Sequence, residues 1–164
     1  MIPSIGLRSR VKRALGLGGR TSLHPGDVAP DLDVADASGK RWTLAELRGQ
    51  RAVVYFYPKD DTPGCTREAC DLRDRHAGLG AVVLGVSTDE AASHRAFAQK
   101  FNLPFPLLAD VGGAMARRWG VLDGANARRA TFVLDREGRI AAVWDPVKVD
   151  GHGAEVAAAV AELP

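Results

Sequence analysis

The two cysteines of the chain, Cys65 and Cys70, are the residues best suited to chemistry. Cys65 follows Thr62 and Pro63, which have the form of a helix start, with threonine as N-cap and proline at the first helical position. A helix start presents unpaired N–H groups and the positive end of the helix dipole, and both stabilise an anion. Because the thiolate is the reactive form of cysteine, this position predicts a nucleophile rather than a small buried residue.

The residues just before Cys65 suit a reactive sulfur. Gly64 leaves the approach to the sulfur uncrowded, and Thr62 places a hydroxyl three positions before the cysteine. We expect that hydroxyl to bond either the thiolate or an oxygen of the bound substrate.

The five-residue spacing between Cys65 and Cys70 makes a physical demand. On an ideal helix, Cα atoms five residues apart are separated by roughly 8–9 Å. A disulfide needs about 4.4–6.8 Å between Cα atoms, so the two cysteines cannot bond while the helix is intact. A redox role for Cys70 therefore predicts that the first turns of the helix unwind after Cys65 is oxidised. The alternative is that Cys70 is a core residue without a redox role.

The cysteine count also excludes several classes of protein. Two cysteines are too few for a disulfide-stapled secreted scaffold or a zinc site rich in cysteine. The four histidines are scattered, and none pairs with a cysteine at ligand spacing. We expect no metal, haem or flavin. A lone Cys-x₄-Cys indicates redox work in a reducing compartment, for which we expect the cytoplasm.

Charge divides the chain unevenly. Five of the 22 basic residues lie in the first 20 positions, which contain no acid, and this leaves 17 basic against 20 acidic residues. We interpret residues 1–22 as a basic, glycine-rich, flexible extension and residues 23–164 as one domain. An amphipathic helix on an anionic surface is the alternative for the extension. The domain has no basic stripe for nucleic acid, and no apolar run is long enough to span a membrane.

The sequence shows alternating strand and helix patterns, and the elements they predict must position these cysteines. An apolar run over 52–57 predicts a central buried strand that Pro58 ends, and a helix follows over 63–77. Further strands are expected at 32–34, 81–87, 106–109, 130–134 and 140–144, a helical turn at 44–47, and helices at 90–101, 113–119 and 153–161. This order predicts an α/β protein with a mixed sheet and helices on both faces, as in the thioredoxin-like fold.

The segment around Cys65 resembles the peroxiredoxins. Their Pro-x-x-x-Thr-x-x-Cys signature is met by Pro58, Thr62 and Cys65, and the second cysteine five residues on resembles the bacterioferritin comigratory protein or PrxQ subfamily. The segments 130–135 and 147–152 are also similar to that subfamily, and the resemblance covers about residues 23–162.

The resemblance implies a role for each matching residue. Cys65 resembles the peroxidatic cysteine that becomes a sulfenic acid, and Cys70 the resolving cysteine that forms an intramolecular disulfide with it. Thr62 resembles the hydroxyl that orients peroxide, and Pro58 a residue that shields the pocket. The family also uses an arginine from a later strand. Arg129 fits best, but the neighbouring Arg128 leaves that assignment open.

The expected function is therefore a thiol peroxidase with antioxidant activity that reduces hydrogen peroxide and organic (alkyl) hydroperoxides. The resemblance implies thioredoxin as the reductant, with glutaredoxin as the alternative, and either a monomer or a homodimer. A redox sensor or relay that uses the same cysteines is the competing hypothesis. A thioredoxin-like disulfide reductase is disfavoured because the chain has no Cys-x-x-Cys.

Other conspicuous side chains have structural interpretations. We expect Trp42, Trp119 and Trp144 to pack in the interior and His152 to be structural or solvent-facing. Arg67 and Glu68 are expected on the exposed side of the helix that carries Cys65.

Overall fold

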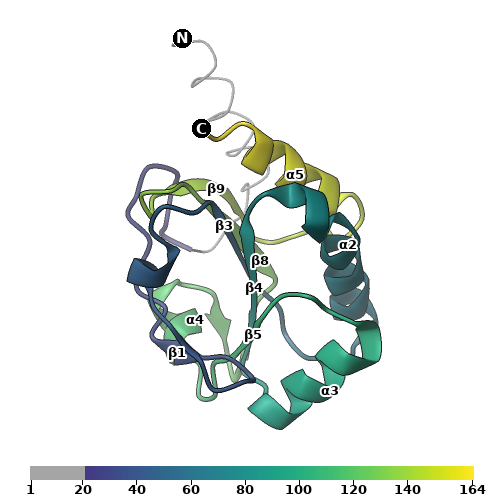
Figure 1. The fold of residues 1–164 in the computed structure, drawn as a ribbon. Helices are drawn as coiled ribbons and strands as arrows, with labels where there is room; N and C mark the ends of the chain where they lie inside the picture. The colour runs from purple at the N-terminus through teal and green to yellow at the C-terminus, as the bar shows by residue number, and fades with distance from the viewer. Residues whose placement is uncertain (1–20) are drawn as a thin grey trace.

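The computed structural model describes residues 21–164, and Figure 1 shows their fold. The predicted extension over 1–22 lies outside the described residues except for its last two positions. A five-stranded sheet in the order β5-β4-β3-β8-β9 forms the centre of the domain. In the described part of the chain, no helix is long and apolar enough to cross a membrane.

The strand that leads to the cysteines is the middle strand of this sheet. β3 (Ala52–Phe56) is buried along its whole length, as the continuous apolar run predicts. It pairs in parallel with β4 (Val82–Ser87) and antiparallel with β8 (Ala130–Leu134). β5 (Leu107–Ala109) extends the parallel half and β9 (Ile140–Trp144) the antiparallel half. The C-terminal end of β3 is thus held by partners on both sides.

Helices cover both faces of the sheet (Figure 1). α2 (Pro63–Leu79), α3 (Ala91–Phe101) and α5 (His152–Ala161) pack on one face, where Leu72, Phe97 and Val156 share a core cluster with Tyr55. α4 (Ala114–Arg118), the 3₁₀ turn η1 (Leu44–Leu47) and a small hairpin cover the other. The predicted thioredoxin-like α/β architecture is confirmed.

The structure adds short elements that the sequence pattern does not predict. β1 (Val34–Ala35) pairs with β2 (Arg41–Trp42), and β6 (Leu122–Asp123) pairs with β7 (Asn126–Ala127). β1 begins at the last residue of the strand expected at 32–34. Two-residue strands have too few positions to show an alternating pattern, which explains why β2, β6 and β7 were not expected.

Helix ends differ slightly from expectation. α2 continues past the predicted end near residue 77 and includes Gly78, and Gly80 ends it in the left-handed conformation with φ 70°. α5 begins one residue earlier than predicted, at His152. Trp42, Trp119 and Trp144 are buried, which confirms their packing role.

Candidate active site

The loop after β3 and the start of α2 build the site. Thr62 is the N-cap residue, with extended backbone, and Pro63 is the first residue of the helix, as predicted. The Thr66 amide donates to the Thr62 carbonyl at 2.8 Å, so the helical hydrogen bonds begin around Cys65. Cys65 is consequently the third residue of α2, within the turn whose N–H groups lack helical partners.

Cys65 is a free thiol that is almost completely enclosed, with 2% of its surface exposed. The Nη2 atom of Arg129 donates to its sulfur at 3.3 Å. Gly64 makes room for this contact, because a Cβ atom at that position would lie 3.1 Å from the same Nη2. The helix start and the guanidinium therefore both favour negative charge on the sulfur.

Glu68 is the other partner of Arg129, and the prediction that it lies on the exposed side of the helix is wrong. Its side chain is buried, and its Oε1 accepts a hydrogen bond from Arg129 Nη1 at 2.8 Å. Burial raises the pKa of Glu68 to about 7, although the charge and hydrogen bond of Arg129 act to lower it. The guanidinium thus links a buried carboxyl group to the cysteine. Arg67 is exposed as predicted and pairs with Asp150.

The two neighbouring arginines have different partners. Arg128 donates from Nη2 to Asp145 at 2.7 Å and to the Gly120 carbonyl at 2.8 Å. Arg129 alone of the two makes a hydrogen bond to Cys65. The geometry therefore favours Arg129 in the role that the sequence left open between them.

Thr62 and Pro58 border the site without a hydrogen bond to the sulfur. The Thr62 hydroxyl donates to the Lys59 carbonyl at 3.0 Å, so its proton points within the loop and its lone pairs stay available. Pro58 is half-buried and follows the buried Tyr57 at the end of β3. Both residues lie on the short loop that leads into α2.

Cys70 is a half-buried free thiol on the same unbroken helix as Cys65. With helical backbone between the two cysteines, the Cα separation expected for their spacing exceeds what a disulfide allows. The structure thus shows the dithiol form with the helix intact.

One group of potential metal ligands occurs among residues 21–164. Ligand-type atoms of Asp60, Asp89 and His94 lie within 4.8 Å of one another. These residues hydrogen-bond to one another: His94 Nδ1 lies 2.7 Å from Asp60 Oδ2, and Asp89 Oδ2 accepts from the Asp60 amide at 2.8 Å. The group is therefore a hydrogen-bond network beside the site.

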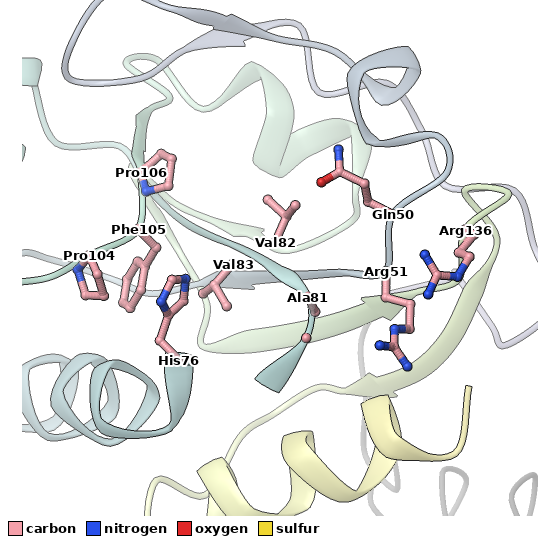
Figure 2. Close-up of a pocket in the computed structure, with 11 residues that line it drawn as sticks. Gln50, Arg51, His76, Ala81, Val82, Val83, Pro104, Phe105, Pro106 and Arg136 are labelled. Atoms are coloured by element: carbon pink, nitrogen blue, oxygen red, sulfur yellow. The ribbon is translucent and has the colours of Figure 1, made fainter. Parts of the chain in front are cut away.

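A cavity of about 410 Å³ lies at the other end of the sheet (Figure 2). Arg51, Val82 and Phe105 line it, with His76 from the end of α2 and Arg136 from the turn between β8 and β9. It flanks the N-terminal ends of β3 and β4, whereas Cys65 follows the C-terminal end of β3. None of the predicted site residues contributes to it.

Comparison with known proteins agrees with this geometry. Residues 25–143 match the model of the AhpC/TSA family. A putative peroxiredoxin bcp of Coxiella burnetii is 45% identical over 146 residues, covering 82% of this chain and 97% of that protein. The peroxiredoxin Bcp of Bacillus subtilis is 42% identical, covering 82% and 92%. A chloroplastic peroxiredoxin Q of Triticum aestivum is 44% identical over 75% of this chain, which spans 59% of that relative.

Solved structures give the same result. The chain superposes on a Xanthomonas campestris peroxiredoxin Q with a TM-score of 0.76 and 34% identity, covering 87% of this chain and 97% of that one. It superposes on BcpB of Mycobacterium tuberculosis with a TM-score of 0.79 and 32% identity, covering 87% and 99%.

A thioredoxin-like fold that places a cysteine at a helix start beside an arginine defines the peroxiredoxin class of thiol peroxidases. The chain belongs to the AhpC/TSA family, among its Bcp and PrxQ peroxiredoxins. The prediction of a peroxiredoxin is thus confirmed at the level of family and enzyme class.

Proposed function

We propose that this peroxiredoxin reduces hydrogen peroxide and organic hydroperoxides through a Cys65 sulfenic acid and a Cys65–Cys70 disulfide. The observation that carries the proposal is the 3.3 Å hydrogen bond from Arg129 Nη2 to the Cys65 sulfur at the start of α2. A bacterioferritin comigratory protein of Xanthomonas campestris, 33% identical to this chain, is described as having alkyl peroxide reduction activity.

The first step is a displacement at oxygen. The Cys65 thiolate attacks the nearer oxygen of the hydroperoxide, an S–O bond forms, and the O–O bond breaks. The electron pair of the O–O bond leaves with the distal oxygen, which takes up a proton to give water or an alcohol. Sulfur is oxidised to the sulfenic acid, and donors such as the Arg129 guanidinium stabilise the charge that moves onto the oxygens.

Thr62 and Pro58 complete the peroxide site in this proposal. The lone pairs of the Thr62 hydroxyl are free to accept a hydrogen bond from the hydroperoxide O–H, because its proton is given to Lys59. Pro58 presents an apolar ring that has no N–H to compete for the peroxide and limits the access of water.

The second step joins the two cysteines. The Cys70 sulfur attacks the Cys65 sulfenic sulfur, an S–S bond forms, and the hydroxyl group leaves as water with the thiol proton. Because the spacing excludes this bond within an intact helix, the N-terminal turns of α2 unwind first. Cys70 is only half-buried, and this exposure suits a thiol that must move.

An external dithiol then returns the enzyme to its starting form. Its thiolate attacks the disulfide, and its second thiol releases the product, so two electrons pass to the protein. We propose thioredoxin as this reductant, with glutaredoxin as the alternative, and the cytoplasm as the compartment. Either a monomer or a homodimer is compatible with an intramolecular disulfide.

The decisive experiment compares single-cysteine variants with the wild type. We expect Cys65→Ser to lose peroxide consumption, and Cys70→Ser to consume one equivalent and then hold a sulfenic acid that a dimedone-type reagent traps. Wild-type protein treated with peroxide should give an intramolecular disulfide by mass spectrometry. Peroxide consumption by Cys65→Ser at the wild-type rate would overturn the proposal.

The reductant is tested separately in steady state. Thioredoxin and glutaredoxin systems are each supplied with hydrogen peroxide or an alkyl hydroperoxide, and oxidation of the reductant is followed. Sustained turnover with thioredoxin supports the proposed cycle. A single oxidation without turnover, followed by a mixed disulfide with another protein, would instead identify a redox relay.

A further inference from the structure

Asp60 lies in the middle of the loop that carries Pro58 and Thr62. Its carboxylate is buried and accepts two hydroxyl hydrogen bonds, from Tyr57 at 2.6 Å and from Ser93 at 2.8 Å. The carboxylate thereby connects the end of β3 to the first turn of α3. No bond of this network includes Cys65.

His94 is the third partner of this carboxylate. The ring is completely buried, its Nε2 lies 2.9 Å from the Leu108 carbonyl, and its Nδ1 lies 2.7 Å from Asp60 Oδ2. A carbonyl oxygen can only accept, so Nε2 carries a proton. Burial raises the pKa of Asp60, but the hydrogen bonds from His94 and Tyr57 outweigh this and hold it below its ordinary value. The Nδ1 contact is a short, buried hydrogen bond between the imidazole ring and the Asp60 carboxylate.

Two further hydrogen bonds connect the same loop to α3 and to the segment that precedes it. The Asp60 amide donates to Asp89 Oδ2 at 2.8 Å, and this oxygen also accepts from the Ser87 hydroxyl at 2.7 Å. The next residue, Asp61, has a left-handed backbone with φ 58° and accepts from Lys100 at 2.8 Å. The loop is therefore held by α3 and the end of β4 as well as by the start of α2, which it precedes.

A buried polar contact of this kind contributes little to stability. Removing such groups from water costs about as much free energy as their interaction returns, and apolar replacements of buried ionisable pairs are often neutral or stabilising. The contacts do fix the orientation of the His94 ring and of the Asp60 carboxylate, because each ring nitrogen has a partner at a set position. Asp60 lies two positions before Thr62, so this fixed orientation also fixes the backbone of the loop that carries Thr62.

We propose that Asp60 and His94 are positioning residues for the peroxide step. They fix the loop so that Thr62 and Pro58 keep their places beside Cys65, and they leave α2 free to unwind beyond it. The inference rests on the proposed function, since it assumes that peroxide binds at this loop and that α2 opens afterwards. Reacting atoms must be held within a few tenths of an ångström, and a displacement of about 1 Å can cost about 10²-fold in rate.

The test measures the two chemical steps separately by stopped-flow fluorescence. In Asp60→Asn and His94→Gln we expect the second-order rate constant of Cys65 oxidation to fall about tenfold or more. The rate of the following disulfide formation and the ultraviolet absorbance of the Cys65 thiolate should stay at wild-type values. A general loss of structure would change all three readings.

Two further variants keep the test decisive. Ser93→Ala removes only one exposed hydroxyl from the carboxylate, so it should fold and show a smaller loss in the same step. Asp110→Asn is the matched control, because this buried carboxylate caps α4 through the Met115 and Ala116 amides and does not bond the loop. It should change thermal stability and leave the peroxide step unchanged.

The double variant Asp60→Asn/His94→Gln tests whether the two residues act as one unit. We expect its rate constant of Cys65 oxidation to fall no further than that of the slower single variant, since the interaction can be removed only once. Folded single variants that oxidise Cys65 at the wild-type rate would overturn the inference, as would losses that multiply in the double variant. If the wild type itself does not oxidise Cys65, the proposed function fails instead.

Discussion

Arg129 donates to the Cys65 sulfur from one terminal nitrogen and to the Glu68 carboxyl group from the other, at 3.3 Å and 2.8 Å. Both contacts require the forked guanidinium, because the compact ammonium group of a lysine does not match two acceptors in this way. Arg129 is thus oriented by Glu68 as well as attracted by the thiolate.

Replacement of Arg129 by lysine should slow the peroxide step while keeping the positive charge. Loss of one aligned donor typically costs about 10²–10³-fold, and we expect about 10²-fold here because lysine retains part of the electrostatic effect. The same replacement at Arg128, whose partners are Asp145 and the Gly120 carbonyl, is the matched control. Stopped-flow oxidation of both variants checks this, and an equal loss in the two would contradict the assigned orientation.

Most of the fold could be predicted because its elements have strong local signals. The β-branched and aromatic apolar run over 52–57 favours a buried strand, and Thr62 with Pro63 marks the start of α2. The Cys65–Cys70 disulfide stays a prediction, because their spacing allows it only if the first turns of α2 unwind. What escaped prediction lacks such a signal, as in the two-residue strands β6 and β7.

The site residues that sequence reasoning missed depend on contacts far apart in the chain. Glu68 looks like an exposed helix residue beside Arg67, and only Arg129, 61 positions later, makes its burial tolerable. Asp60 and His94 are 34 positions apart and meet because β3 and β4 are neighbours in the sheet. A glutamate three positions after Cys65 was the one visible hint, because that spacing places both on the same side of a helix.

Glu68→Gln should change the pH dependence of the peroxide step. With a pKa of about 7, Glu68 gains its charge as the pH rises through neutrality, and the ionised form is the better acceptor for Arg129. We therefore expect the wild-type rate constant to contain an increase across pH 7 that Glu68→Gln lacks.

Glu68 should also affect stability, with a definite sign. Its pKa is raised from an ordinary value of 4.5, so between these two values the folded state holds a proton that the unfolded chain releases. The free energy of unfolding therefore decreases as the pH rises from about 4.5 to 7 and levels off above that. Urea titrations of both proteins over this range should show a steeper decrease in the wild type than in Glu68→Gln.

Gly64→Ala should disturb the guanidinium without disturbing the helix. The added Cβ would lie 3.1 Å from Arg129 Nη2, so the nitrogen that bonds Cys65 has to move by a few tenths of an ångström. We expect the peroxide step to slow about tenfold, less than complete loss of the donor. Gly78→Ala on the same helix is the control, because its Cβ would meet nothing within 4 Å. That change should stabilise the protein by about 0.5–1 kcal/mol at an unchanged rate.

His152 should make the protein less stable in mild acid. Its ring is buried, with Nε2 2.8 Å from the Thr131 hydroxyl, and burial lowers its pKa below the ordinary 6.5 although Glu155 acts to raise it. The unfolded chain therefore binds a proton that the folded state resists. The stability that this neutral ring contributes is complete above pH 6.5 and declines as the pH falls towards the lower pKa of the folded state.

The test of this acid sensitivity is replacement of the histidine by glutamine. His152→Gln should lose about 1 kcal/mol at neutral pH through the weakened bond to Thr131, and should show a smaller decline below pH 6.5. His24→Gln, at an exposed histidine, should keep the wild-type profile. Denaturant titrations at several pH values measure these differences. A parallel decline in His152→Gln and wild type would show that the acid sensitivity arises elsewhere in the fold.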